Sequence, residues 1–565
     1  MRVLWLCLLF CFISCKNIDT NKNDENDSSP EPVQEPVPVL KDSIVSEVGP
    51  KDFRELRVLD SKYLKNNELW SSLDDEMSNF SQMDHDQLKP LIFDQDIPTI
   101  QQHVIDGNLS YENLTKFYLY RIRKYDREND LSLNSVISIN PIVLSQAREL
   151  DSIMSSERAS EENELLKYSV FGMPILLKDN INAEGMATTA GAAILKDNFT
   201  KDAFITAQLK ERGALILGKT NLSEWAYFFC GDCPSGYSAI GGQTLNPYGR
   251  RIFDTGGSSS GSGVAVAANL CVAAIGSETS GSILSPSSQN SVVGLKPTVG
   301  LVSRSGIIPI SSTLDTAGPM TKNVVDNAIL LSEIYGEDKA DEKSIWSLWD
   351  RELYFNNLET DNLTGKRFGA IKRLMKDTLY TSALNTLRSK GAIIVEIEPE
   401  RKERKGFISL LNLDMRNDLP VYLENYAAES VSIRSIQEII DFNSLDSINA
   451  APYGQRLFRG IVADKGNAQT LDSIKTNLHK IGKEFFDVPT KEYELDAILS
   501  INNYHAGYAA VAEYPAITVP MGYDQDGKPK GLTFIAERLR EKQLLEWAYA
   551  YEQASQMRKS PANYN

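Results

Sequence analysis

The stretch from Asp254 to Thr298, DTGGSSSGSGVAVAANLCVAAIGSETSGSILSPSSQNSVVGLKPT, decides how this chain folds. Two clusters of small residues, Gly256–Gly263 and Ser277–Ser282, are separated by an almost wholly apolar run. A flexible linker can be rich in Gly and Ser, but it does not lead into a run such as Val264–Ala268. We therefore expect a buried helix and a buried strand that hold two tight loops, an arrangement suited to binding or catalysis.

The composition is that of a soluble globular protein with an acidic surface. The chain has 565 residues, of which 42% are hydrophobic and 24% charged. Its formal net charge is −17, and no cluster of Lys and Arg with interleaved aromatic residues offsets it. Nucleic acids and anionic membrane surfaces would be repelled, so we expect no nucleic-acid partner.

The N-terminus has the pattern of an export signal. Arg2 precedes the apolar run Val3–Phe12, which is too short to span a bilayer as a helix. Ser14 then stands directly before Cys15, and polar residues follow at once. This resembles a bacterial lipoprotein signal, in which cleavage leaves a lipidated Cys; the alternative is an ordinary secretory signal with an incidental Cys. We expect a signal peptide over residues 1–15 and a protein whose only membrane attachment is a lipid on Cys15, in the cell envelope.

The remainder of the chain divides by composition. Residues 16–50 are rich in Asn, Asp, Glu, Ser and Pro, which predicts a disordered tether with a reach on the order of 30 Å. A helical extension is expected over residues 51–90. The main domain is expected over residues 91–560, with a variable or cap region at about residues 335–500.

Helices and apolar strands alternate in the first half of the main domain. Ser110 can cap a helix whose apolar side chains recur at 3–4 spacing from Leu114 to Tyr125. Met173–Leu177 suits a buried strand, and Asp202–Arg212 predicts a helix that ends before a second buried strand, Ala214–Leu217. This alternation indicates a mixed or parallel sheet covered by helices.

The second half continues the pattern after an insertion. Tyr380–Lys390 predicts a helix and Ala392–Ile397 a strand, whereas Phe407–Asp487 is more polar and helical. Two further strands are expected at Ile517–Val519 and Leu532–Ile535. The expected fold class is therefore α/β, a large mixed sheet covered by helices on both faces, with a helical insertion.

One nucleotide-binding motif is accidental. Gly213–Thr220 matches the phosphate-loop pattern letter for letter. A phosphate loop needs its strand before the first Gly and an open loop between the glycines. Here the intervening residues Ala214–Leu217 are themselves the expected strand, so no loop is left to hold a phosphate.

Histidine chemistry has little support. The four histidines are His85, His103, His479 and His505, and only His505 lies near an expected core segment. We therefore expect neither a histidine base nor a histidine-ligated metal.

The cysteines that remain after export are Cys230, Cys233 and Cys271. Cys230 and Cys233 have the spacing of redox or zinc-knuckle pairs, but no second pair completes a four-ligand zinc site. A disulfide and two free thiols both remain open for this pair, and we assign no catalytic role to either residue.

A serine nucleophile with a lysine base remains. Lysine can deprotonate serine only when it is neutral, which requires burial or nearby positive charge to lower its pKa. Lys178, at the end of an apolar strand, is the best-placed lysine. The small residues before Ser282 allow several backbone N–H groups to converge on one point, as an oxyanion hole requires; a plain tight turn is the commoner outcome of such a sequence.

Together these residues resemble the amidase signature family. The family's motifs are a Lys after an apolar strand, a Gly-Gly-Ser-Ser-x-Gly-Ser loop, and a Gly-Thr-Asp-x-Gly-Gly-Ser loop that runs on to Gly-Leu-Lys-Pro-Thr. This chain supplies Lys178, Gly256–Ser262, Gly276–Ser282 and Gly294–Thr298. The similarity extends from about residue 91 to residue 557, and it implies the amidase-signature fold.

The resemblance implies a triad of two serines and a lysine, without metal or cofactor. Ser282 would be the nucleophile that forms an acyl-enzyme, and Ser258, after a cis peptide bond, would pass the proton to the general base Lys178. The backbone N–H groups of Thr279, Ser280, Gly281 and Ser282 would stabilise the oxyanion. The implied substrate is a small-molecule or peptide amide.

The chain departs from the family's motifs at two positions: Glu278 replaces the usual Asp, and Ser280 replaces the first Gly of Gly-Gly-Ser. Other segments (Asn221–Trp225, Gly241–Thr244) resemble the peptide-amidase-like branch more than the tRNA amidotransferase A subunit. That branch would carry polar residues where this chain has Phe228–Cys233, so its substrate specificity does not carry over.

We therefore expect an amidase that hydrolyses a linear carboxamide or peptide amide through an acyl-serine intermediate. Two alternatives differ in function. One is the A subunit of a glutamyl-tRNA(Gln) amidotransferase, which would need cytosolic partners. The other is a non-catalytic binding lipoprotein on an amidase scaffold.

Overall fold

The computed structural model describes residues 56–127, 129–157, 166–345, 353–356, 358 and 362–565. The expected signal peptide with Cys15 and the expected tether over residues 16–50 lie outside these ranges. Within them, no helix combines the length and the apolar character that a membrane crossing requires.

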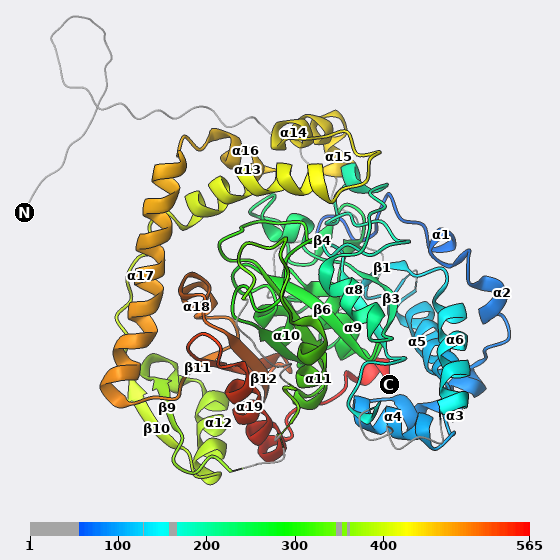
Figure 1. Ribbon diagram of the computed structural model, residues 1–565, viewed down its shortest axis with the longest axis horizontal. Coiled ribbons are helices and arrows are strands. Elements are labelled where there is room, and N and C mark those ends of the chain that lie inside the picture. Colours follow the sequence, from blue (N-terminus) through cyan, green and yellow to red (C-terminus); the bar gives the residue numbers. More distant parts are fainter. Residues whose placement is uncertain (1–55, 128, 158–165, 346–352, 357, 359–361) are drawn as a thin grey trace, which may run out of the picture. The chain divides into compact units, whose positions relative to one another are not determined.

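The described residues form an eleven-stranded mixed sheet and a separate two-stranded one (Figure 1). The order in the large sheet is β1-β3-β2-β6-β8-β7-β12-β13-β11-β9-β10, and β4 pairs with β5. The strands are β1 Val136–Ile139, β2 Pro174–Lys178, β3 Leu215–Thr220, β4 Tyr237–Ser238, β5 Gly242–Gln243, β6 Ala273–Glu278, β7 Val293–Lys296, β8 Thr316–Thr321, β9 Arg367–Ile371, β10 Ile393–Ile397, β11 Ala497–Ile501, β12 Ala516–Tyr523 and β13 Pro529–Ile535.

The sheet is parallel at two places and antiparallel elsewhere. β2 runs parallel to both neighbours, β3 and β6, and β9 runs parallel to β10 and β11. The pairs from β6 through β8, β7, β12 and β13 to β11 are antiparallel, as is β1 with β3. Because β2 and β6 are parallel, their carboxyl ends meet at one edge of the sheet. That edge carries Lys178 from β2 and Glu278 from β6.

Helices cover both faces of the sheet. α9 and α10 pack on each other and on the strands around β6, whereas α8, α11, α19 and α12 form a second connected layer. The helices are α1 Asn66–Trp70, α2 Asp74–Met77, α3 Gln82–Ile92, α4 Ile97–Ile105, α5 Tyr111–Tyr125, α6 Val143–Glu157, α8 Phe204–Glu211, α9 Ser260–Ala267, α10 Leu284–Gln289, α11 Val324–Ile334, α12 Thr378–Ser389, α13 Phe407–Asn425, α14 Ile436–Leu445, α15 Ser447–Ala450, α16 Arg456–Ala463, α17 Ala468–Tyr493, α18 Ala506–Ala512 and α19 Glu541–Ser555. The expected fold class, including the helical insertion, is confirmed.

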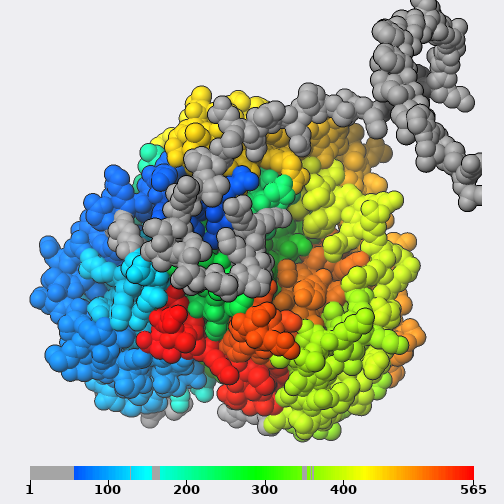
Figure 2. Space-filling view, turned by 180° about the vertical axis from the view of Figure 1, so that it is seen from behind, coloured from blue at the N-terminus to red at the C-terminus, as the bar shows by residue number. Residues whose placement is uncertain are grey.

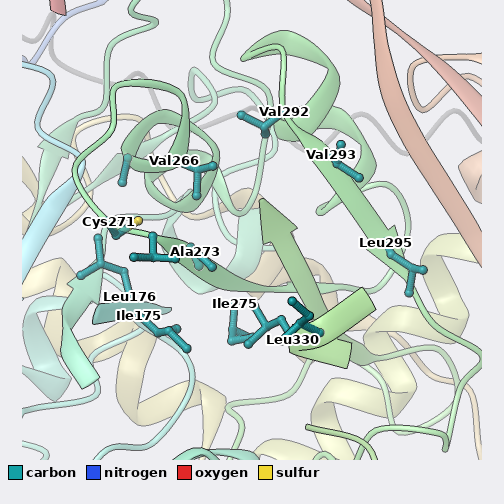
Figure 3. Packing of buried hydrophobic residues seen from close by; sticks show 14 of the residues in the cluster. Ile175, Leu176, Val266, Cys271, Ala273, Ile275, Val292, Val293, Leu295 and Leu330 are labelled. Atoms are coloured by element: carbon teal, nitrogen blue, oxygen red, sulfur yellow. The ribbon is translucent and has the colours of Figure 1, made fainter. Parts of the chain in front are cut away.

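The central strands are apolar on both sides because both of their faces are covered. Ile175 and Leu176 of β2 and Ile275 of β6 are fully buried. Figure 3 shows them packed together with Val266 of α9 and Leu330 of α11. This core holds the carboxyl ends of β2 and β6 rigidly beside one another.

The stretch from Asp254 to Thr298 forms the expected helix and strand, but its two loops are shorter than expected. Ser260–Gly263 belongs to the first turn of α9 rather than to the loop, and it packs against a neighbouring backbone: a Cβ on Gly261 would lie 2.4 Å from the Asn221 carbonyl oxygen. Ser277 and Glu278 are the last residues of β6, because they pair with β8. The small residues therefore serve close packing as well as turns.

The segment that matches the phosphate-loop pattern is a strand. β3 runs through Gly218 and Lys219 to Thr220, and all six of its residues are buried between β1 and β2. The prediction that no phosphate loop forms here is confirmed.

The N-terminal helices α1 to α3 pack into the same core as the sheet. Ser81 caps α3, and the guanidinium of Arg121 on α5 donates to the carbonyl oxygen of Tyr564 near the C-terminus. Figure 2 shows the C-terminal residues (red) lying beside the N-terminal helices (blue and cyan). The C-terminal residues therefore pack against the N-terminal helical region.

The helical insertion, α13 to α17, has a hydrophobic cluster of its own. That cluster includes Leu410 and Leu413 of α13 and Phe458 of α16, together with Trp225 and Phe229 from the main domain. The insertion is thus anchored on the segment that follows β3, close to the carboxyl edge of the sheet.

Candidate active site

Lys178 lies at the centre of a polar cluster at the carboxyl end of β2. Its Nζ is 2.7 Å from Ser258 Oγ, 2.9 Å from Ser277 Oγ and 3.0 Å from the Ser277 carbonyl oxygen. Asn180 Nδ2 donates to the same Ser277 hydroxyl at 3.0 Å. The structure therefore brings the two predicted residues Lys178 and Ser258 into direct contact.

Burial lowers the pKa of Lys178. The side chain is fully buried, and loss of hydration lowers its pKa to about 7, although the carboxylates of Asp315 and Glu278 act in the opposite direction. No carboxylate of the described residues lies within ion-pair distance of Nζ. The neutral amine that a lysine base requires is therefore well populated near pH 7.

The hydrogen bonds of Lys178 allow its lone pair to point at Ser258 when the amine is neutral. A neutral amine has two N–H donors and one acceptor site, and it has three partners here. The Ser277 carbonyl can only accept, and the Ser277 hydroxyl can accept while donating to Asn180 Oδ1 at 3.3 Å. In that arrangement the remaining partner, the Ser258 hydroxyl, can donate to Nζ.

The Ser258 loop is held from several sides. The peptide bond between Gly257 and Ser258 is cis. Gly256 has φ +65°, and a Cβ there would lie 2.7 Å from the backbone of Ser285, so only glycine fits. The carbonyl oxygen of Ser258 accepts from Ser223 N at 3.0 Å.

The loop from Thr279 to Ser282 exposes backbone donors. Within the described part of the chain, the N–H groups of Thr279, Ser280, Gly281 and Ser282 donate no hydrogen bond. Gly281 has φ +96°, whereas Ser280 does not have a positive φ, so serine is accommodated there without strain. The replacement of Gly by Ser280 therefore leaves the backbone of this loop available to a ligand.

The two loops are joined by their backbones. Ser259 N donates to the Ser282 carbonyl oxygen at 3.1 Å, and Ser259 Oγ donates to the Ser277 carbonyl oxygen at 3.1 Å. The Ser282 side chain is 9% exposed, and its hydroxyl has no hydrogen-bond partner among the described residues. The Ser258 and Ser282 hydroxyls do not bond to each other directly, which is common in active sites without substrate.

Glu278 holds the backbone that follows Ser282. Its Oε2 accepts from Ile283 N at 2.8 Å and Leu284 N at 3.0 Å, so the carboxylate caps the start of α10. Glutamate in place of the family's usual aspartate is therefore accommodated at this position.

The sequence did not single out three polar residues of the site. Asp315 accepts from Thr279 Oγ1 at 2.5 Å and from the backbone N–H groups of Ile310 and Ser311. Asn180 and Ser277 form a hydrogen bond with each other, and Ser277 also forms one with Lys178. Ser277 lies within the predicted motif Gly276–Ser282 and Asn180 lies two residues after Lys178, so proximity could have indicated both, but no sequence signal marks Asp315.

His505 has a structural environment. It is buried and its ring nitrogens contact Ser500 Oγ at 2.6 Å and Arg373 Nη2 at 2.5 Å. Burial, and then the nearby Arg373, lower its pKa to about 3. Histidine chemistry is absent from the predicted triad, and among the described residues no group of three or more His, Cys, Asp or Glu is placed to hold a metal ion.

Cys230 and Cys233, left open by the sequence, are joined by a disulfide. Their loop lies on the insertion: Phe229 packs edge-on against Phe458, and Leu457 N donates to the Phe229 carbonyl oxygen at 2.9 Å. Phe228 and Phe229 are buried in the hydrophobic cluster that includes the insertion. The third cysteine, Cys271, is a buried thiol whose pKa is raised by burial to about 12.

Comparison with known proteins agrees with this geometry. The Amidase family model matches residues 113–460. A probable amidase of Arabidopsis thaliana is 35% identical over 474 residues, covering 81% of this chain and 89% of its own length. The A subunit of the glutamyl-tRNA(Gln) amidotransferase of Microcystis aeruginosa is 31% identical over 506 residues, covering 83% and 99%.

A solved structure is similar as well. The native peptide amidase of Stenotrophomonas maltophilia superposes with a TM-score of 0.78 at 38% identity, covering 83% of this chain and 98% of that one. The family match spans more than half of the chain, and the similarity in sequence and in structure extends over most of it. The chain therefore belongs to the amidase signature family and is a peptide-amidase-like hydrolase of amide C–N bonds.

Proposed function

We propose that this protein hydrolyses a linear carboxamide or a peptide amide through an acyl-serine intermediate. The observation that carries the proposal is the contact between the buried Lys178 amine and the Ser258 hydroxyl, 2.7 Å apart, beside the partly accessible Ser282. A neutral lysine, a relay serine and a nucleophilic serine with free backbone donors are the parts that acyl transfer requires.

In the first half-reaction, Ser282 Oγ attacks the carbonyl carbon of the amide. Its proton passes to Ser258 Oγ, while the Ser258 proton passes to the Lys178 amine, whose lone pair faces that hydroxyl. The backbone N–H groups of the 279–282 loop hold the oxyanion that develops on the carbonyl oxygen. Collapse breaks the C–N bond, and the proton returns through Ser258 to the departing nitrogen, which leaves as ammonia or an amine.

In the second half-reaction, water replaces the departed nitrogen. The same relay takes one proton from the water as it attacks the acyl carbon, and returns it to Ser282 Oγ when the ester bond breaks. The products are a carboxylic acid and the free serine. Burial of Lys178 supports both halves, because its pKa of about 7 lets the amine accept and release a proton near neutral pH.

The peptide-amide class of substrate is supported by similarity. One structural neighbour is a native peptide amidase, and another is a peptide amidase in complex with the competitive inhibitor chymostatin. The sequence similarity to amidotransferase A subunits supports a second candidate, a glutaminase-type subunit that works with partners. Hydrolysis of free glutamine with no hydrolysis of peptide amides would favour that candidate.

We also propose that the protein is anchored in the cell envelope through Cys15. The support is the pattern of Arg2, the apolar run Val3–Phe12 and Ser14 before Cys15. The Cys230–Cys233 disulfide supports an oxidising compartment. Metabolic labelling with an alkyne fatty acid should mark the wild type and not Cys15→Ser; equal labelling of both would exclude the anchor.

The proposed chemistry is tested by ammonia release from a panel of aliphatic, aromatic and peptide amides. Wild-type protein should release ammonia, and Ser282→Ala should lose at least about 10³-fold in kcat/KM. Ser285→Ala is the matched control, because its hydroxyl makes no hydrogen bond to the described residues and lies one helical turn away. Wild-type rates in Ser282→Ala would refute the proposal.

A further inference from the structure

A cavity of about 640 Å³ lies between the helical insertion and the main domain. Its walls come from α13, α17, the end of α18 and the loop that precedes β8, and include Leu410, Lys475, Val511 and Leu314. Figure 1 shows α18 lying on the inner side of α17, with α13 running from the upper end of that helix. A volume of this size suits a peptide of a few residues or a ligand of similar size.

The lining of this cavity is cationic in a strongly acidic protein. Two carboxylates line it, Glu342 and Glu513. Five cationic side chains line it, and they come from four separate segments of the chain: Arg304, Lys343, Lys475, Lys483 and Arg538. The chain as a whole has a net charge of −17, so the tertiary fold concentrates positive charge here.

Most of the carboxylates that pair with these cations lie outside the lining of the cavity. Lys343 lies 2.9 Å from Glu513, and Arg538 pairs with the same carboxylate, so one anion serves two cations. The carboxylate partners of Arg304, Lys475 and Lys483 do not line the cavity; they are Asp341, Asp414 and Asp487. A ligand in the cavity would meet the cations from the side that these carboxylates do not occupy.

Two lining residues respond to this positive field. Burial lowers the pKa of Lys343, and the nearby Arg304, Arg538 and Lys475 lower it further. Burial also lowers the pKa of His479. The hydrogen bond that His479 donates to the Val511 carbonyl oxygen raises this pKa, but three nearby cations lower it further: Lys483, Arg538 and Lys343. Both effects agree with a net positive potential at the cavity.

Two walls of the cavity belong to segments whose neighbouring residues contact the proposed oxyanion loop. Leu314 precedes Asp315, whose carboxylate accepts from Thr279 Oγ1. The other end of α18 adjoins Gly281, where a Cβ would lie 3.5 Å from Ala506 Cβ. Ser258 and Ser282 do not themselves line the cavity, but these two neighbours connect its walls with the 279–282 loop.

We propose that this cavity is the acyl-side subsite of the enzyme and that it takes the acidic side chain of a peptide amide. The inference rests on the proposed function and specifies its substrate class. Leu314, Leu410, Leu478 and Val511 supply apolar walls for the peptide, and the cations pair with its carboxylate. Neutral peptide amides are hydrolysed as well, but more slowly.

The test compares N-acetylated tripeptide amides that carry either Glu or its neutral isostere Gln at each position in turn. At low salt the wild type should show a kcat/KM about tenfold higher for Glu than for Gln at one position or more, because a partly desolvated charge pair is involved. Salt at about 0.5 M should reduce this ratio toward one by screening. A ratio of one at every position would overturn the inference while leaving the proposed hydrolysis intact.

Two lysines on α17 form a matched pair of variants. Lys483 lines the cavity and forms an ion pair of 3.1 Å with Asp487, four residues later in the chain. Lys480 does not line the cavity, and it forms an ion pair of 3.8 Å with Glu484, also four residues later. Lys483→Gln should lower the Glu/Gln ratio about three- to fivefold, and Lys480→Gln should leave it unchanged. Equal effects of the two substitutions would contradict a specific subsite.

A binding measurement separates this inference from the proposed function. Fluorescence anisotropy of the labelled Glu and Gln peptides with the full-length Ser282→Ala protein needs no turnover. Tighter binding of the Glu peptide, weakened by the further substitution Lys483→Gln, supports the subsite even if no amide is hydrolysed. Equal binding of the two peptides refutes it.

Discussion

Two fully buried lysines on neighbouring strands have opposite surroundings. Lys178 ends β2, and Lys219 lies on β3, where it pairs in register with Leu177. Because successive side chains of a strand alternate between faces, this offset of one residue directs the two lysines to opposite faces of the sheet. Thr220, opposite Lys178, contacts Ser262 of α9, so Lys178 is on the α9 side.

The partners of the two lysines differ in charge. Lys219 Nζ lies 3.4 Å from Asp179 Oδ1 and 2.8 Å from Thr188 Oγ1, whereas Lys178 has two hydroxyls and a carbonyl. Burial lowers the pKa of both, and the adjacent Asp179 carboxylate opposes that effect at Lys219. A buried lysine whose partners are hydroxyls and a carbonyl is thus suited to act as a base, whereas one paired with a carboxylate is suited to a structural role.

Replacement of Lys178 should have the largest effect, and that effect should be on activity. Lys178→Met keeps the volume but removes the proton acceptor, so kcat/KM should fall about 10²–10⁴-fold. The free energy of unfolding should change less than in the Lys219 variant below, because no carboxylate loses its partner. Steady-state kinetics and urea unfolding measure the two quantities; wild-type kcat/KM in Lys178→Met would remove Lys178 from the mechanism.

Replacement of Lys219 should act on stability instead. Asp179 Oδ1 has no hydrogen bond within the described part of the chain, so Lys219→Met leaves a buried carboxylate without its ion pair. The free energy of unfolding should fall by about 3–5 kcal/mol. The protein that remains folded should keep a nearly wild-type pH dependence of kcat/KM. A stable Lys219→Met protein with an altered pH profile would reverse the roles of the two lysines.

The pH dependence of activity should follow Lys178. The neutral amine is the active form, and with a pKa of about 7 its fraction rises about tenfold per pH unit below that value and levels off above it. The kcat/KM for an uncharged amide should therefore increase with pH and reach a plateau above about pH 8. The profile of Lys219→Met is the control. A rise that begins only near pH 10 would mean that Lys178 is protonated at neutral pH.

The smallest effect is expected for the second hydroxyl partner of Lys178. Ser277→Ala removes the hydroxyl contact with Nζ and both hydroxyl contacts with Asn180, but keeps the backbone carbonyl contact. We expect kcat/KM to fall by about tenfold, since one such bond contributes about 1 kcal/mol or slightly more. Kinetics of Ser277→Ala and Ser285→Ala side by side measure it; a loss as large as that of Lys178→Met would make Ser277 a relay in its own right.

Local patterns predict the fold class, and the resemblance to the amidase signature family implies the contact between Lys178 and Ser258. Apolar runs of strand length and the helix that Ser110 caps have causes that lie within a few residues, and the structure has β2, β3, α5 and α12 where these patterns place them. The loops around Ser258 and Ser282 are shorter in the structure than the sequence predicts, because a run of small residues does not distinguish a loop from the first turn of a closely packed helix.

The rest of the site depends on contacts that local patterns do not carry. Asp315 approaches Thr279 only because β8 pairs antiparallel with β6, and the cations of the cavity come from segments far apart in the sequence. The sequence likewise does not predict whether Cys230 and Cys233 form a disulfide, because it shows their spacing but not the conformation of the turn between them.

Covalent labelling of Ser282 tests the central claim most directly. A fluorophosphonate should form one adduct per chain, on the peptide that contains Ser282, and the rate of labelling should rise about tenfold per pH unit up to about pH 7 and then level off. Lys178→Met should be labelled slowly at every pH, and Lys219→Met should follow the wild type. An adduct on another residue, or a labelling rate in Lys178→Met equal to that of the wild type, would contradict a buried neutral lysine that activates Ser282.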